Sequence, residues 1–209
     1  MVGIDISHWN RTIEIDNPDI DFVICKATEG ATYHDKRFDE FMKKAIDCGK
    51  LIGAYHFMST TSSPKRQADN FIYRVRDYIG QAILVLDYEG RCGDKLGGSE
   101  GAREFLEYVY KQTGVKPLIY MNKYYLRKYD WSEVVKGDFG LWLADYIVTE
   151  VQLNDNVAKS KYIKPWKIQA IRQYTSFGYV DKYDGLVDLN KAYMSKDAWR
   201  KYAEVHNIE

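Results

Sequence analysis

Short apolar runs recur along this chain, and longer segments with apolar residues at helical spacing separate several of them. Apolar runs of about 4–8 residues that are rich in β-branched and aromatic side chains are typical of buried strands. The pattern predicts strands at 2–7, 22–28, 51–57, 82–89, 116–121, 141–146, 167–175 and 185–190. It predicts helices at 36–48, 64–79, 99–113 and 195–206, with a shorter helix at 123–129.

The order of these elements predicts an α/β barrel of parallel strands. Helices separate the early strands, whereas the later strands have shorter connections, so we expect some barrel helices to be missing. Ser63, Ser99 and Ser195 precede predicted helices and are expected to cap them. The chain shows no repeat and no flexible linker. We therefore expect one domain over 1–192, with 193–209 as a closing helix or the start of a tether.

Polar residues gather where the predicted strands end, which is where the chemistry of α/β barrels takes place. A polar group inside an apolar run costs free energy unless it finds a partner, so several of them at one end of separate strands favour a shared pocket. We expect this pocket to hold four carboxylates, with Lys26 offsetting part of their charge: Asp5, Asp87, Glu89 and Asp188. The other polar or aromatic residues in these positions are Ser7, Thr28, Tyr55, His56, Tyr120, Trp142 and Gln173.

The segment Asp87-Tyr88-Glu89 closes the most apolar of these runs. Side chains alternate along a strand, so the two carboxyls point to the same side. Repulsion and partial burial raise the pKa of one carboxyl, which leaves an acid beside a base. Two such carboxyls are the groups that hydrolyse a glycosidic bond. Taken alone, the same segment also fits a strand that surfaces into a polar turn.

The composition narrows the possible partners. Lys plus Arg and Asp plus Glu are 30 each, so no basic excess indicates nucleic acid. No apolar stretch approaches the length of a transmembrane helix, so we expect no membrane partner. The 18 Tyr and 5 Trp fill a core or bind sugar, because aromatic faces offer apolar area and Tyr adds a polar tip.

The sequence contains no spacing that is typical of a metal or cofactor site, so we expect neither. His8 is expected in the first loop, and His56 as a core residue with satisfied hydrogen bonds. Cys25, Cys48 and Cys92 form no CxxC pair and are expected to be reduced thiols.

Ordered motifs from about residue 2 to residue 192 resemble glycoside hydrolase family 25, the Chalaropsis-type lysozymes. Asp5-Ile6-Ser7-His8-Trp9-Asn10 is similar to the opening motif of that family, and Asp87-Tyr88-Glu89 matches its DxE. The remaining similar segments are 22–30 followed by Tyr33, 53–57, 117–120, 141–144, Gln173-Tyr174 and 187–190.

The resemblance implies an irregular TIM-like β/α barrel with eight strands and about five helices, in which the last strands lack helices. It implies a muramidase that hydrolyses the β-1,4 bond between N-acetylmuramic acid and N-acetylglucosamine in bacterial peptidoglycan. Glu89 would be the general acid, assisted by Asp87, Asp5 and Asp188, whose division of labour stays open. One route uses the substrate's acetamido group as the nucleophile with Asp87 orienting it, and another uses a carboxylate to activate water.

The expected sugar contacts are Lys26, Tyr33, Tyr55, Tyr120, Trp142 and Gln173. The N-terminal residues have neither a basic nor an apolar leader region, so we expect synthesis in the host cytoplasm without a signal peptide. Among family members, a phage endolysin released through a membrane hole fits this best. Two alternatives are a wall-binding protein that has lost turnover and a hydrolase of another N-acetylated polysaccharide such as chitin.

Overall fold

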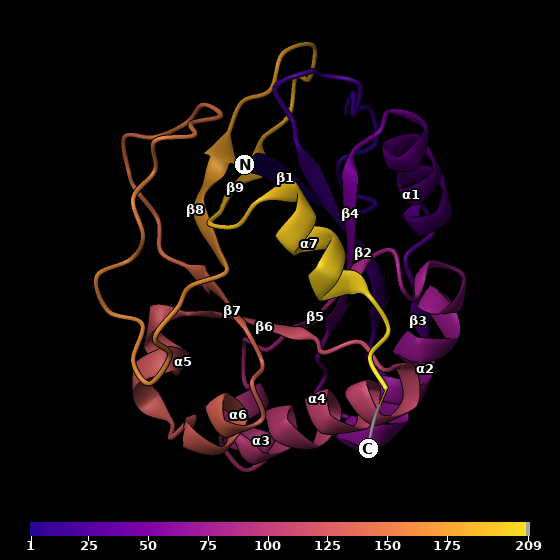
Figure 1. Cartoon of the computed structure of the whole chain (residues 1–209), viewed down its shortest axis with the longest axis vertical. Helices are drawn as coiled ribbons and strands as arrows, with labels where there is room; N and C mark the ends of the chain where they lie inside the picture. Colours follow the sequence, from indigo (N-terminus) through magenta and orange to yellow (C-terminus); the bar gives the residue numbers. More distant parts are fainter. Residues whose placement is uncertain (208–209) are drawn as a thin grey trace.

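A computed structural model describes residues 1–207 as a closed barrel of eight strands (Figure 1). The barrel order is β1-β9-β8-β7-β6-β5-β4-β2, and β2 pairs with β1 to close it. The short β3 (Tyr33–His34) adds to β2 outside the barrel. The barrel strands are β1 (Val2–Ile6), β2 (Phe22–Glu29), β4 (Leu51–Phe57), β5 (Ile83–Asp87), β6 (Leu118–Asn122), β7 (Leu141–Ala144), β8 (Ile171–Gly178) and β9 (Val187–Ala192).

The helices that follow β2, β4, β5 and β6 lie outside the barrel, whereas the connections from β7 to β8 and from β8 to β9 contain no helix (Figure 1). The α-helices of residues 1–207 are α1 (Phe38–Asp47), α2 (Pro64–Val75), α3 (Cys92–Lys95), α4 (Glu100–Thr113), α5 (Lys123–Lys128), α6 (Ser132–Lys136) and α7 (Lys196–Ala203). The residue range 145–170, between β7 and β8, contains no helix. The expected α/β barrel with missing late helices is therefore confirmed.

Side-chain alternation divides the core into two clusters. Phe22, Ile24 and Val85 pack with the cluster inside the barrel, whereas Val23 and Leu84 pack with the cluster that includes the helices. Because successive side chains on a strand point to opposite faces, a residue two positions beyond an interior residue also points inward. This alternation decides which side chains reach the mouth of the barrel.

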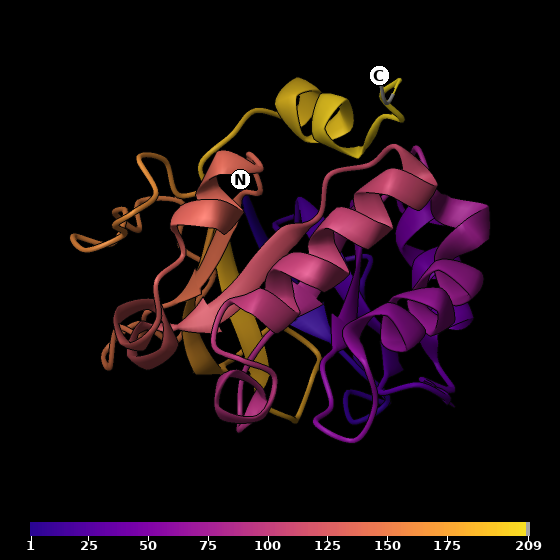
Figure 2. The same ribbon diagram turned by 90° about the horizontal axis from the view of Figure 1, so that it is seen from below.

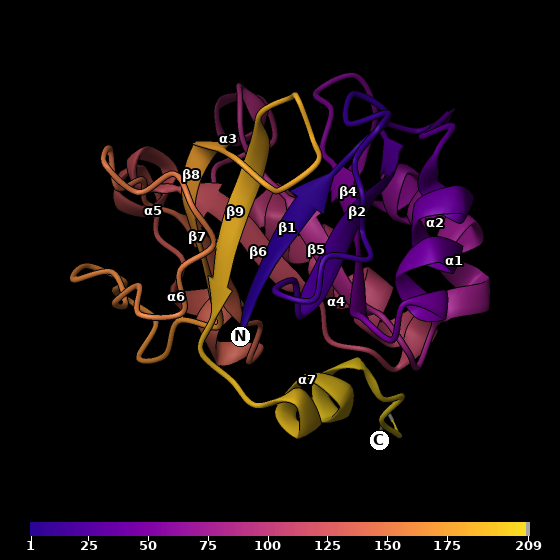
Figure 3. The ribbon, with the colours of Figure 1, turned by 90° about the horizontal axis from the view of Figure 1, so that it is seen from above.

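Helix α7 closes the end of the barrel at which β1 begins (Figures 2 and 3). Trp199 is fully buried and its ring centroid lies 4.7 Å from that of Phe22. Its indole N–H donates to the carbonyl oxygen of Ile52 at 3.1 Å. The opposite end, where the parallel strands finish, stays open for the site.

The last strand corrects the expectation of an all-parallel barrel. β9 runs antiparallel to both β8 and β1. The connection over 179–186 is shorter than the dozen or so residues that a parallel crossover needs, so the chain returns as a hairpin. Asp188 therefore lies near the start of its strand, opposite Asp5, and not near a carboxyl end.

Residues 1–207 form seven α-helices, whereas about five were expected. The additional α3 and α6 span four and five residues, too short to produce a helical period in the sequence. Ser63 and Ser195 accept hydrogen bonds as caps, but the hydroxyl of Ser99 donates to the carbonyl oxygen of Asp130 instead. The strand expected from residue 167 begins only at Ile171.

Candidate active site

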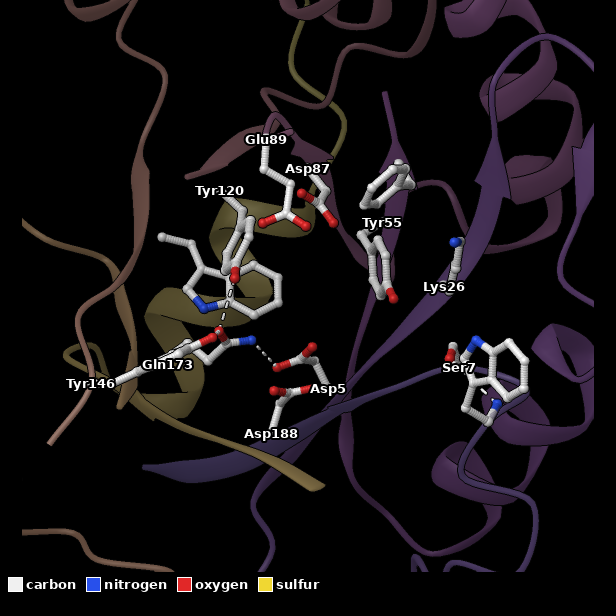
Figure 4. Close-up of a pocket in the computed structure, with 13 residues that line it drawn as sticks. Asp5, Ser7, Lys26, Tyr55, Asp87, Glu89, Tyr120, Tyr146, Gln173 and Asp188 are labelled. Carbon is white, nitrogen blue, oxygen red and sulfur yellow. Dashed lines mark hydrogen bonds between the residues drawn. The ribbon is translucent and has the colours of Figure 1, made fainter. Parts of the chain in front are cut away.

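A cavity of about 270 Å³ opens at the mouth of the barrel, where the parallel strands end (Figure 4). All eight strands of the barrel contribute at least one side chain to its lining. Its lining consists of Asp5, Ser7, Trp9, Lys26, Tyr55, Phe57, Asp87, Glu89, Tyr120, Trp142, Tyr146, Gln173 and Asp188. The four carboxylates that the sequence singles out thus meet in one cavity.

Strand alternation explains why these side chains meet. Lys26 follows the interior residue Ile24 by two positions, and Asp87 follows Val85 in the same way. Glu89 lies two residues beyond Asp87, just past the end of β5. The apolar interior thus continues directly into the polar floor of the cavity.

A hydrogen-bond network holds Asp5 in place. Its Oδ2 atom accepts from the side-chain amides of Gln173 at 2.9 Å and Asn190 at 2.7 Å. The hydroxyl of Tyr120 donates to Oε1 of Gln173 at 2.8 Å, and the indole N–H of Trp142 donates to Oδ1 of Asn190 at 2.9 Å. Both amides are thereby oriented with their donors toward Asp5, which favours its ionised form.

Asp87 and Glu89 form the second half of the carboxylate cluster (Figure 4). Asp87 is buried, and Glu89 is half-buried. Burial, followed by the charges of Glu89 and Asp5, raises the pKa of Asp87 well above its usual range, although Lys26 opposes this. Burial also raises the pKa of Glu89, and Lys26 lowers it. The pair therefore holds a proton more readily than two exposed carboxyls do.

The other two carboxyls titrate at higher pH than usual as well. Burial raises the pKa of Asp5 to about 6 against the opposing hydrogen bonds of Asn190 and Gln173. Burial, with the charges of Asp5 and Glu89, raises the pKa of Asp188 to about 8. Lys26 is the only Lys or Arg in the lining of the cavity, and its ammonium also contacts Glu29 at 2.7 Å. The cluster is therefore partly protonated near neutral pH.

Replacing Asp188 by Asn should raise the melting temperature, and should do so more at pH 8 than at pH 4. A carboxyl whose pKa rises on folding stabilises the folded state below its unfolded pKa, and this contribution is lost as the pH rises through the folded pKa. For Asp188 that window runs from its ordinary value of 3.8 to about 8. Asn does not titrate, so the melting temperature of the variant relative to the wild type should rise across this pH range and then level off.

Thermal melts of both proteins at several pH values check this prediction. A change of 1 kcal/mol shifts the melting temperature of a chain this size by about 2–4 °C, which such melts resolve. A difference between Asp188→Asn and the wild type that stays constant from pH 4 to pH 8 would contradict the raised pKa.

Two of the expected sugar contacts, Tyr33 and Trp142, are less accessible from the cavity than expected from the sequence. Tyr33 is not among the residues that line the cavity; its hydroxyl contacts His8 at 3.2 Å, and its ring centroid lies 5.8 Å from the Lys26 ammonium. Trp142 is only 2% exposed, and its N–H is bonded to Asn190. Packing within the barrel mouth therefore accounts for Trp142 without a sugar.

The structure adds Trp9, Phe57, Tyr146 and Asn190 to the expected residues. Trp9 is 75% exposed at the cavity, and Tyr146 donates its hydroxyl to Gln173 at 2.9 Å. Trp9 lies in a connection, where no periodicity identifies a face, whereas Tyr146 lies two positions beyond the end of β7 and continues its alternation. The sequence could have identified Asn190 as a site residue, because it lies two positions beyond Asp188 on the same strand and therefore faces the same side.

The remaining polar residues have structural partners. His56 is buried, contacts Oγ1 of Thr28 at 2.8 Å and stacks on Phe105, as expected for a core residue. His8 lies in the first loop and pairs with Asp35 at 2.8 Å. The three cysteines are free thiols.

The described part of the chain holds no group of three His, Cys, Asp or Glu residues arranged to bind a metal ion. Within residues 1–207, no helix combines the length and the apolar character that crossing a membrane requires.

Tyr55 offers the clearest free hydroxyl for a sugar. It lines the cavity half-buried, and among residues 1–207 its hydroxyl has no hydrogen-bond partner, whereas that of Tyr120 is bonded to Gln173.

Tyr55→Phe should therefore keep the melting temperature and lower turnover. The expected loss is about 2–13-fold, because one hydrogen bond to the substrate is worth roughly 0.5–1.5 kcal/mol. Tyr120→Phe should lower both. Melting and wall lysis on the same preparations check this, and equal behaviour of the two variants would contradict it.

Comparison with known proteins agrees with this geometry. The family model for glycosyl hydrolases family 25 matches residues 4–183. YegX of Escherichia coli (strain K12) is 31% identical over an alignment of 207 positions, and this alignment covers 90% of this chain and 68% of YegX. The autolytic lysozyme of Clostridium acetobutylicum is 27% identical, and the match covers 91% of this chain and 55% of that enzyme.

The solved structures agree with the fold. The CTP1L endolysin superposes with a TM-score of 0.74 at 26% identity, over 97% of this chain and 68% of that one. The family model spans most of the barrel, from β1 to the hairpin before β9. The chain belongs to glycosyl hydrolases family 25.

Proposed function

We propose that this protein is a peptidoglycan muramidase that hydrolyses the β-1,4 bond between N-acetylmuramic acid and N-acetylglucosamine. The observation that carries the proposal is the convergence of Asp5, Asp87, Glu89 and Asp188 on one cavity of a family 25 barrel. Similar proteins are an autolytic lysozyme and an endolysin, which supports the bacterial cell wall as the place of action. Synthesis in a host cytoplasm and release through a phage membrane hole remain a prediction.

Glu89 is the proposed general acid. It lies just past the end of β5, half-buried at the cavity, so a glycosidic oxygen can reach it. Its raised pKa keeps a proton available closer to neutral pH than an exposed glutamate does. Glu89 gives this proton to the leaving oxygen as the glycosidic bond breaks. A water molecule then supplies the hydroxyl of the new reducing end, and its other proton returns to the Glu89 carboxylate.

Asp87 is the proposed partner of the substrate's acetamido group. Its Oδ1 atom is buried and has no hydrogen-bond partner among residues 1–207. A buried acceptor without a partner costs free energy, and a substrate N–H would remove that cost. This supports the route in which Asp87 orients the acetamido group as the nucleophile.

Asp5 and Asp188 complete the proposed machinery on the other side of the cavity (Figure 4). Asp5 is held by two amide donors and has the lower pKa of the two, so it supplies the more persistent negative charge. Negative charge near the sugar ring stabilises the oxocarbenium-like transition state of glycoside hydrolysis.

Purified cell walls test the proposal against a binding protein without turnover. The wild type should reduce the turbidity of a wall suspension and release new reducing ends, and Glu89→Gln should still bind but release them about 10²–10⁴-fold more slowly. Binding by the wild type without any new reducing end would contradict the proposal.

A further inference from the structure

A basic groove lies on the outer wall of the barrel, lined by residues of α5, of β8 and of the connection from β7 to β8. Figure 1 shows where these elements lie. Its volume is about 410 Å³. The charged residues in its lining are one acid, Asp145, and five cations: Lys123, Arg127, Lys159, Lys161 and Arg172. The chain as a whole has zero net charge, so this groove reflects a local separation of charge.

Three of these cations have no acidic partner. The Asp145 carboxylate pairs with Lys123 at 2.5 Å and with Arg172 at 3.4 Å. Within residues 1–207, no carboxylate lies within 4.0 Å of Arg127, Lys159 or Lys161. All three are exposed. Unpaired, exposed cations around a concave surface attract an anion at little desolvation cost.

Aromatic rings extend the groove. The Arg127 guanidinium lies 5.6 Å from the ring centroid of Tyr162, which is 68% exposed. Both residues also line a neighbouring hollow of about 390 Å³, together with Lys164, Trp131 and one acid, Asp130. From residue 159 to residue 167 the chain carries four lysines and no acidic residue. The cations thus follow a path and do not surround a single point.

The groove lies behind one wall of the catalytic cavity. Gln173 faces the cavity, whereas its neighbour Arg172 lines the groove. In the same way, Tyr146 faces the cavity and Asp145 the groove. Alternation along and just beyond the strands therefore places an acidic cavity and a basic groove on opposite sides of β7 and β8.

We propose that this groove binds an anionic phosphodiester polymer of the bacterial wall, such as teichoic acid, next to the glycan strand in the catalytic cavity. The inference rests on the proposed muramidase function for the choice of a wall polymer. A path of several unpaired cations suits a repeating charge better than the single carboxylates of stem peptides. Lys and Arg both bind phosphate, and Arg does so through a fork of donors.

Binding to purified poly(glycerol phosphate) teichoic acid tests the proposal, with Glu89→Gln as the background so that nothing is cleaved. Adding Arg127→Gln, Lys159→Gln and Lys161→Gln should weaken binding about 10-fold, because three exposed positive charges are lost. A matched control carries Lys43→Gln, Lys111→Gln and Lys201→Gln, three exposed lysines on α1, α4 and α7 that have no acidic partner within residues 1–207. The control should bind like the parent, and melting temperatures confirm that both variants fold.

Two outcomes overturn the proposal. Equal losses in the groove variant and the control would show that only net charge matters. Equally tight binding of single-stranded DNA with the same number of phosphates would mean that the surface does not select a wall polymer.

A separate cleavage assay distinguishes failure of this inference from failure of the proposed function. Walls stripped of phosphodiester polymers by hydrofluoric acid should be cleaved equally by the wild type and by the triple groove variant on the wild-type background. If neither protein cleaves these walls, the muramidase assignment fails, while the teichoic acid measurement still decides on the groove.

Discussion

Replacing Glu89 by Gln should leave the fold intact and lower turnover on cell walls by about 10²–10⁴-fold, the usual contribution of general acid–base catalysis. The substitution nearly conserves shape and removes the only proton that Glu89 can donate. Because Glu89 is half-buried and burial raises the pKa of its carboxyl, the variant should be at least as stable as the wild type. Release of reducing ends and thermal melting on one preparation measure both effects.

Glu104→Gln is the matched control, since Glu104 is exposed on α4 outside the cavity lining. The control should retain full turnover. A folded Glu89→Gln protein with turnover like that of the control would remove Glu89 from the role of general acid.

Replacing Asp87 by Asn should lower turnover strongly and move the alkaline limb of the pH–rate profile to lower pH. The charge of Glu89 is, after burial, the next cause that raises the pKa of Asp87, so the two carboxyls compete for protons. In such a pair the last proton leaves at a raised pH, because its loss places two negative charges together. Asn removes that repulsion, so Glu89 should lose its proton at lower pH.

The pH dependence of kcat/KM for both proteins measures this shift, because it reports the ionisations of the free enzyme. Turnover should fall because Asn keeps the shape of Asp87 but cannot carry its charge. If the alkaline limb stays in place while turnover falls, Asp87 acts without influencing the protonation of Glu89.

Much of the barrel and the cluster of carboxylates followed from alternation and from the apolar runs. Asp87 and Glu89 share a side because side chains two positions apart along a strand lie on the same face. The antiparallel direction of β9 was not predicted, because an apolar run indicates a strand but not the direction in which that strand runs. Asp188 nevertheless reaches the cavity, since its antiparallel partner on β1 is Asp5.

Of the residues that the sequence analysis missed, only Trp9 lies in an irregular connection, where periodicity carries no information. Phe57 and Asn190 lie in strands, and Tyr146 lies two positions beyond the last residue of β7, so alternation could have placed all three on the side of the cavity. Tyr33 was expected as a sugar contact; it lies outside the lining of the cavity but next to it, with the Lys26 ammonium 5.8 Å from its ring centroid. The roles of Gln173 and Asn190 as donors to Asp5 depend on long-range hydrogen bonds, which no local pattern encodes.

Digestion of a defined muropeptide polymer, with mass spectrometry of the products, tests the proposed function most directly. We expect every new reducing end to be N-acetylmuramic acid, and we expect chitin oligomers to remain intact. New reducing ends on N-acetylglucosamine, or cleavage of chitin at a comparable rate, would contradict it.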